Sequence, residues 1–134
     1  MKGRTIHKTI WCDRGWMPVY YAFCSSEMAW HAELKRLKAE PTPYPAGDAN
    51  TSRFRDIPGQ AKLLVVVTVA EAIDRKKDTI GVMALLAHEA AHVWQAIRED
   101  IGEDSPSHEF EAYAIQNIFA SLADAYSKTR QKIK

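Results

Sequence analysis

The sequence has few cysteines, no long apolar run and almost no net charge, and each shortage excludes a class of protein. Two cysteines in 134 residues are too few for a disulfide-stapled domain. The 18 Lys and Arg nearly balance the 17 Asp and Glu, so a formal net charge of +1 gives no reason to expect nucleic acid or a membrane as a partner. The longest apolar stretches, near residues 63–70 and 81–87, fall far short of the ~20 residues that cross a bilayer.

The remaining composition is that of a folded domain. Hydrophobic residues make up 46% and charged residues 26% of the chain, and residues 1–134 are enough for a single domain with one core. The basic start Met1–Arg4 is not followed by the apolar segment of a secretory signal. Cys12 and Cys24 lie in neighbouring predicted strands but not opposite each other, so we expect reduced thiols and a cytoplasmic protein.

Turn residues and β-branched runs predict a small sheet. Residues 5–13 and 16–24 are rich in Ile, Trp, Val, Tyr and Phe and flank Arg14-Gly15, which predicts a β-hairpin. Residues 41–59 carry four prolines and two glycines, which predicts a loop. Lys62–Val69 is the clearest strand, and because it is apolar on both faces we expect it to be buried while still offering one edge.

Three helices are expected beside this sheet. The first follows a cap at Ser25 or Ser26, and the second runs from a cap at Asp78 or Thr79 to Gly102. The second is apolar nearly all round from residue 80 to 87, which predicts a central, buried helix. The third opens at Ser105-Pro106. The expected buried stripes are Met28, Trp30, Leu34 and Leu37 in the first helix and Ala112, Ile115, Ile118, Phe119, Leu122 and Tyr126 in the third. The predicted fold class is α+β.

The segment that carries chemistry is His88-Glu89-Ala90-Ala91-His92, in the middle of the second helix. Residues at i and i+4 share a helix face with Cβ atoms ~5–6 Å apart, so the two imidazoles can bind one tetrahedral zinc ion. Glu89 lies about a quarter-turn away, where its carboxylate can take a proton from a zinc-bound water as general base. The alternative is two partly exposed histidines on the polar side of an amphipathic helix.

A catalytic zinc needs a third protein ligand, and the candidates lie at the start of the last helix. The short loop of residues 100–106 lets that helix return beside the zinc helix. His108, Glu109 and Glu111 are the possible ligands, and by helical phase His108 and Glu111 lie nearer the apolar stripe than Glu109 does.

A family resemblance bears on this choice. The HEAAH helix followed by Glu109-Phe110-Glu111-Ala112 resembles the gluzincin metallopeptidases, in particular the compact intracellular ones related to the ImmA/IrrE regulators and the M48 type. Their second motif is Glu-x-x-Ala followed by Asn or Asp, and its Glu is the third zinc ligand. Matching its Ala to Ala112 implies Glu109 as that ligand. The resemblance covers residues 80–122 and implies a zincin-like fold, with a small antiparallel or mixed sheet packed against a central HExxH helix and a C-terminal helix.

Two further features bear on this resemblance. Tyr113 stands where the family has Asn or Asp, so its hydroxyl is a candidate to orient a His ligand or stabilise an oxyanion, while simple packing is the alternative. The strings HEAAHVWQ and EAYAIQ are also similar to small hypothetical proteins of phages and prophages. This similarity implies a bacterial cell or a phage-infected host cell.

Together these residues predict a zinc-dependent metallopeptidase that hydrolyses a peptide or protein substrate. Zincins in general pair an extended substrate with an edge strand beside the site, and Lys62–Val69 is the candidate strand. A non-catalytic, zinc-stabilised module for binding, regulation or phage assembly is the main alternative. A zinc hydrolase of non-peptide bonds is a weaker one. The oligomeric state is open.

Overall fold

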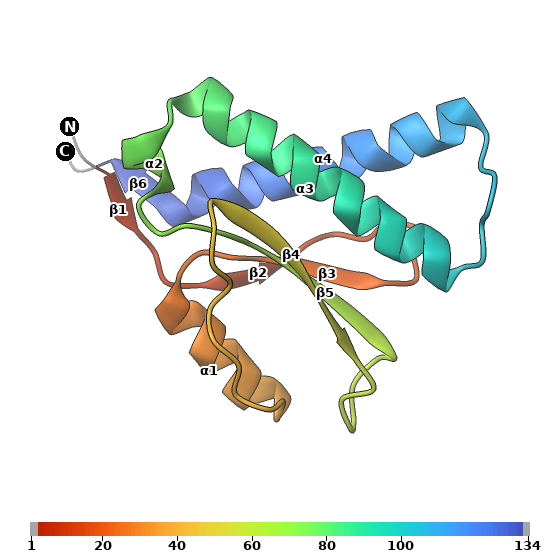
Figure 1. The fold of residues 1–134 in the computed structure, drawn as a ribbon, viewed down its shortest axis with the longest axis horizontal. Coiled ribbons are helices and arrows are strands. Elements are labelled where there is room, and N and C mark those ends of the chain that lie inside the picture. The colour runs from red at the N-terminus through yellow and green to blue at the C-terminus, as the bar shows by residue number, and fades with distance from the viewer. Residues whose placement is uncertain (1–2, 133–134) are drawn as a thin grey trace.

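The computed structural model describes residues 3–132, and its helices and strands are shown in Figure 1. The fold is α+β, which confirms the predicted fold class. In chain order the elements are β1 (Gly3–Thr5), β2 (Thr9–Trp11), β3 (Tyr20–Cys24), α1 (Glu27–Leu37), β4 (Ala49–Arg55), β5 (Leu63–Val69), α2 (Ile73–Lys76), α3 (Thr79–Asp100), α4 (His108–Thr129) and β6 (Arg130–Lys132).

The main sheet has four strands in the order β2-β3-β5-β4. β3 and β5 run parallel, whereas β2 pairs with β3 and β4 pairs with β5 antiparallel, so the sheet is mixed. β4 forms one edge, in register with β5 from Ala49 opposite Val69 to Arg55 opposite Leu63. The outer side of β4 is therefore the edge of the sheet that lies beside α3.

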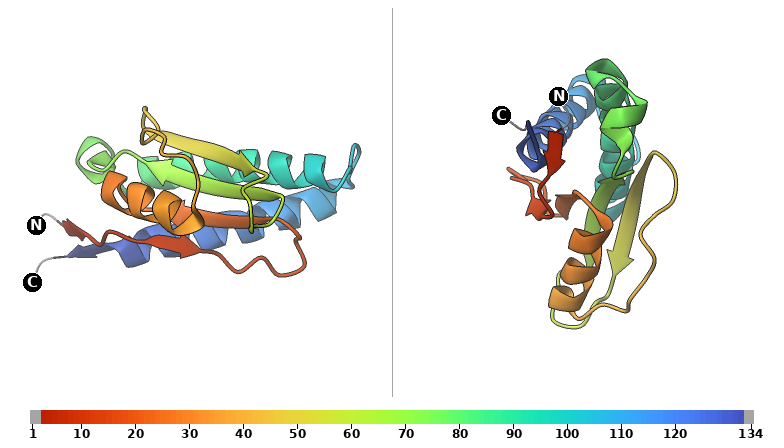
Figure 2. Two further views of the ribbon diagram at one scale, coloured as in Figure 1. Left: turned by 90° about the horizontal axis from the view of Figure 1, so that it is seen from below. Right: turned by 90° about the vertical axis from the view of Figure 1, so that its left-hand side faces the viewer.

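β5 is buried along its whole length because helices cover both faces of the sheet (Figure 2). Its alternate residues face opposite sides, as the pleat of a strand requires. Leu63, Val65, Val67 and Val69 belong to the core built with α3 and α4. Val66 points the other way and packs with Trp30 and Leu34 of α1. Burial on both faces accounts for the apolar run that predicted this strand.

α3 and α4 form an antiparallel hairpin over one face of the sheet. The Asp78 side chain caps α3 by accepting a hydrogen bond from the backbone N–H of Gly81 at 2.8 Å. The chain leaves the helix at Gly102, whose φ of +70° favours glycine. The two helices meet through residues at helical spacing, including Ala90, Val93, Ile97, Ala114, Ile118 and Leu122.

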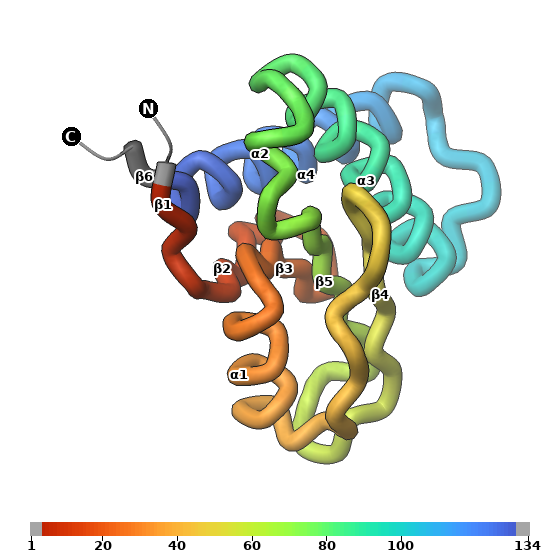
Figure 3. Tube along the Cα trace, turned by 60° about the vertical axis from the view of Figure 1, so that its left-hand side comes forward, coloured from red at the N-terminus to blue at the C-terminus, as the bar shows by residue number. Residues whose placement is uncertain are grey.

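The chain also pairs its first described strand with its last. β1 and β6 form a separate antiparallel ladder in which Arg4 lies opposite Gln131. Just inside this ladder, the backbone N–H of Ile6 donates to the carbonyl of Thr129 at 2.8 Å. The tube in Figure 3 shows β1 beside the C-terminal end of α4.

The prediction that residues 41–59 form a loop is wrong, because β4 occupies Ala49–Arg55. The hairpin is confirmed only in part: β2 pairs with β3, but residues 3–5 pair with β6 instead. Lys62–Val69 was expected to offer an edge, and this is also wrong, because β3 and β4 cover both sides of β5. Cys24 lies opposite Thr9, so the two cysteines do not face each other and both are free.

Helix details also differ from expectation. Met28 is 64% exposed because it lies off the stripe that buries Trp30, Leu34 and Leu37. The first turns of α3 are not buried all round, since Ile80 is 80% exposed. Ser107 rather than Ser105 caps α4.

Within residues 3–132 no helix is both long and apolar enough to cross a membrane.

Candidate metal centre

Four polar residues of α3 lie in one line along the helix: His88, His92, Gln95 and Glu99. Their spacing of i, i+4, i+7 and i+11 keeps them on one face, while Leu86, Val93 and Ile97 turn into the core. Because β4 runs beside this polar face, side chains from the strand can reach it.

The two imidazoles of the motif converge. Nε2 of His88 lies 3.2 Å from Nε2 of His92, and the ring centroids are 4.8 Å apart. Two nitrogens bound at ~2.0–2.1 Å to one tetrahedral ion would be separated by ~3.3 Å, so this spacing fits a shared zinc ion. The same distance also fits a hydrogen bond between the two rings when one of them carries the proton on Nε2.

Gln95 orients the second imidazole. Its side-chain oxygen lies 2.9 Å from Nδ1 of His92, and an oxygen can only accept, so this contact requires the proton on Nδ1. In the neutral ring, Nε2 of His92 then carries a lone pair directed toward His88.

Glu89 is buried between α3 and β4, with 5% of its surface exposed. Its Oε1 accepts a hydrogen bond from the Thr51 hydroxyl of β4 at 2.8 Å. A carboxylate is costly to bury without such a partner, so this contact with the edge strand both satisfies and orients it. The prediction that His88, Glu89 and His92 share one site matches their placement at one cleft.

Two adjoining clefts open on this face of the molecule. One, of about 360 Å³, is lined by Ala49, Asn50, Thr51, Arg53, His88, Glu89 and His92. The other, of about 490 Å³, is lined by Asp48, Ala49, Lys77, Gly81, Ala84, Leu85, His88 and Glu89. Because Ala49, His88 and Glu89 line both of them, the two clefts adjoin between α3 and β4, and we call the pair the α3–β4 groove.

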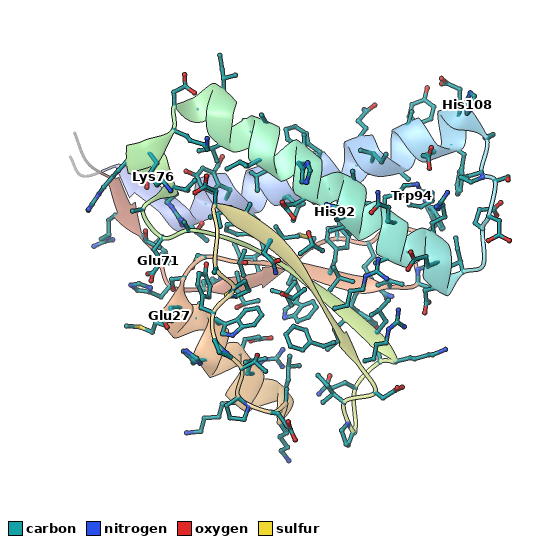
Figure 4. All side chains as sticks on the ribbon, in the orientation of Figure 1. Glu27, Glu71, Lys76, His92, Trp94 and His108 are labelled. Carbon is teal, nitrogen blue, oxygen red and sulfur yellow. The ribbon has the colours of Figure 1, made fainter. Side chains whose placement is uncertain are left out.

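The candidate third ligands do not join the histidine pair. Figure 4 places His108 at the end of the α3–α4 hairpin, well away from His92. Glu109 is exposed, Tyr113 is 59% exposed, and neither lines the α3–β4 groove. Within the described part of the chain, no group of three or more His, Cys, Asp or Glu side chains is arranged to hold a metal ion.

Trp94 explains why α4 begins on the other side of α3. Its indole Nε1 donates to Oε2 of Glu111 at 2.8 Å, and its ring packs edge-on against Phe110 at 5.8 Å. Trp94 follows His92 by two residues, which is about 200° around the helix. The first turn of α4 therefore contacts the face of α3 opposite the imidazoles, and Glu111 is engaged there.

Sequence reasoning missed the residues of β4 that line the groove, namely Asn50, Thr51 and Arg53. One signal was present: the run from Ala49 to Ile57 contains no proline, and turn residues Gly47-Asp48 and Pro58-Gly59 bound it. Such punctuation is typical of a strand. The prolines on either side led to the loop prediction.

Comparison of the chain with protein-family models, curated proteins and solved structures gives no match.

Proposed function

We propose that this chain is a zinc-dependent metallopeptidase with a zincin-like fold. One observation carries the proposal: the Nε2 atoms of His88 and His92 lie 3.2 Å apart at the mouth of a groove, beside the buried carboxylate of Glu89. An open groove suits a catalytic zinc, which must admit substrate, better than a structural zinc, whose site is closed by protein ligands.

In this proposal His88 and His92 hold the ion, and Gln95 keeps His92 in the required tautomer. When bound, zinc supplies a Lewis acid that polarises the substrate carbonyl and acidifies a water molecule. Glu89 accepts the proton from the attacking water and delivers it to the leaving amine. The Thr51 hydroxyl fixes Oε1 of Glu89 through its hydrogen bond, which leaves Oε2 to handle the proton.

The substrate would enter as an extended peptide along β4. This strand is an edge of the sheet and borders the groove, so its outer backbone groups are positioned to pair with a peptide. β4 thus takes the role that the sequence analysis gave to Lys62–Val69. A peptide paired there would pass in front of His88 and His92.

Glu109 remains the third ligand that the family resemblance implies. The contacts of Trp94 with Glu111 and Phe110 hold the first turn of α4 on the opposite side of α3. Glu109 could therefore reach His92 only after this turn had separated from Trp94. The ligand set is for this reason the first point to test.

The first experiment measures zinc per chain after reconstitution and desalting. We expect a single zinc ion in the wild type and loss of zinc in His88→Ala and His92→Ala. His31→Ala is the matched control, because His31 is an exposed histidine of α1 on the far face of the sheet. Glu109→Ala and Glu111→Ala decide which carboxylate, if either, is a ligand. Wild-type protein that takes up no zinc would refute the proposal.

The second experiment measures cleavage of a quenched fluorescent peptide library. Glu89→Gln should retain zinc and lose hydrolysis, because the amide cannot accept the proton. Hydrolysis that survives this change would remove the mechanism. Ester and amide substrates in the same panel separate a peptidase from a hydrolase of other bonds.

A non-catalytic zinc module is the second candidate function. It is favoured by the lack, within residues 3–132, of a third ligand grouped with the histidines, since a partner protein could complete the coordination. This function predicts that chelation lowers the melting temperature while no peptide in the library is cleaved.

A further inference from the structure

Basic side chains lie at both ends of the α3–β4 groove. At one end Arg53 lines the cleft that contains His92. Nη1 of Arg53 lies 2.5 Å from Oε2 of Glu99, and about a third of the Arg53 side chain is exposed. Its guanidinium is therefore part of the groove wall and can be approached from solvent.

Two more arginines lie within electrostatic range of the same carboxylate. The hydrogen bond and charge of Arg53 lower the pKa of Glu99, and the charges of Arg55 and Arg98 lower it further. Among the ion pairs of residues 3–132, none joins Arg55 or Arg98 to an acidic group. At this end of the groove three arginines thus stand near one carboxylate, and the ion pair there is made by Arg53.

The opposite end is also basic. Asp48 pairs with Lys76 at 2.7 Å, and Lys77 lines the cleft beside it. Here two ammonium groups share one carboxylate. Glu89, the remaining carboxylate of the groove, is buried and hydrogen-bonded to Thr51. Basic side chains therefore outnumber acidic ones at both ends of the groove.

The strand spacing relates these charges to a bound peptide. Thr51 contacts Glu89 beside the histidines, and Arg53 is two residues further along β4, a rise of ~6.6 Å. Arg53 and Arg55 lie on the same face of the strand, because side chains alternate. A peptide paired with β4 has the same rise per residue. If one peptide residue lies opposite Thr51, the peptide residue two positions further on lies beside Arg53. An edge strand offers backbone pairing that nucleic acid cannot use, which favours a peptide as the anion.

We propose that the α3–β4 groove selects acidic peptides. One Asp or Glu of the peptide, two residues from the peptide residue opposite Thr51, would pair with Arg53 and Arg55. The planar guanidinium groups bind a carboxylate in a bidentate manner, which gives specificity as well as attraction. This inference names the substrate class of the proposed peptidase and in that sense rests on the proposed function.

The test measures binding directly, so that it does not depend on hydrolysis. Short fluorescein-labelled peptides of one sequence, with a Glu moved through each position or replaced by Gln, are titrated by fluorescence anisotropy into zinc-loaded Glu89→Gln protein. The Glu form with the correct register should bind roughly tenfold more tightly than its Gln form, a difference of ~1.4 kcal/mol. Arg53→Gln with Arg55→Gln should abolish that difference, whereas Lys35→Gln, which removes a charge from the exposed face of α1, should keep it.

Each outcome is decisive. Equal binding of Glu and Gln peptides overturns the inference, as does a preference that survives in the double arginine variant. A single-stranded oligonucleotide that displaces the best peptide at a lower concentration also overturns it, because the groove would then select phosphate. An arginine-dependent acidic preference in a chain that cleaves nothing keeps this inference and removes the proposed function. Cleavage without any acidic preference does the reverse.

Discussion

The hydrogen bond between Thr51 and Glu89 offers a direct test of how the groove is held together. Thr51→Val replaces the hydroxyl by a methyl group of similar size, so the buried carboxylate loses its partner while packing is retained. A hydrogen bond to a charged group contributes about 1.5–3 kcal/mol to the free energy of unfolding, and a group left unsatisfied costs a similar amount. For 134 residues, an unfolding entropy of ~2.1 cal/mol/K per residue converts this cost into a fall in melting temperature of about 5–11 °C.

The assay is a double-mutant cycle followed by circular dichroism, with zinc chelated in every sample. Thr51→Val is measured alone and in a Glu89→Ala background, where the hydroxyl has no carboxylate to satisfy. Most of the cost should vanish in that background. Thr51→Ser keeps the donor and should recover most of the stability. An equal cost of Thr51→Val with and without the Glu89 carboxylate would refute the reasoning, because the effect would then come from packing.

Three further predictions follow from the core, an ion pair and the thiols. Leu86→Ala should lower the free energy of unfolding in urea by about 2–5 kcal/mol, because Leu86 is fully buried. Ile80→Ala, on the exposed side of the same helix, should change it by less than about 0.5 kcal/mol. Burial raises the pKa of Glu33, but hydrogen bonds from Arg36 and Trp11 outweigh it and hold this pKa below its ordinary 4.5. The ionised Glu33 therefore stabilises the folded chain above pH 4.5, and this stabilisation is lost as the pH falls through the folded-state pKa. The urea midpoints of the wild type and Glu33→Gln should differ at neutral pH and become equal in acid. Burial raises the pKa of Cys12 to about 12, so the native chain should react with a thiol reagent at neutral pH far more slowly than the urea-unfolded chain.

Helices were predictable here because their signals are local. Ser26 and Asp78 accept hydrogen bonds from the first turns that they cap, and Gly102 supplies the left-handed residue after α3. The pair His88 and His92 was likewise predictable, since one helical turn brings the rings together whatever surrounds them. The β5 strand was predictable because burial on both faces leaves an unbroken apolar run.

The missed features depend on contacts between distant segments. β4 is an edge strand with few buried residues, so its sequence lacks the apolar alternation that marks a half-buried strand. The contact of Thr51 with Glu89 spans 38 residues, and no local pattern encodes it. Motif spacing also does not say on which side of α3 the return helix packs. The indole of Trp94 sets that side by contacting Glu111 and Phe110.

The ladder between β1 and β6 has a consequence for the order of folding. Its partners Arg4 and Gln131 lie near opposite ends of the described residues 3–132, so their pairing closes a very long loop. During synthesis β1 leaves the ribosome before β6 and cannot pair with it until residues 130–132 have been made. By then the sheet and the α3–α4 hairpin have all of their residues available. We therefore expect β1 to pair with β6 last, after the sheet and the α3–α4 hairpin have formed.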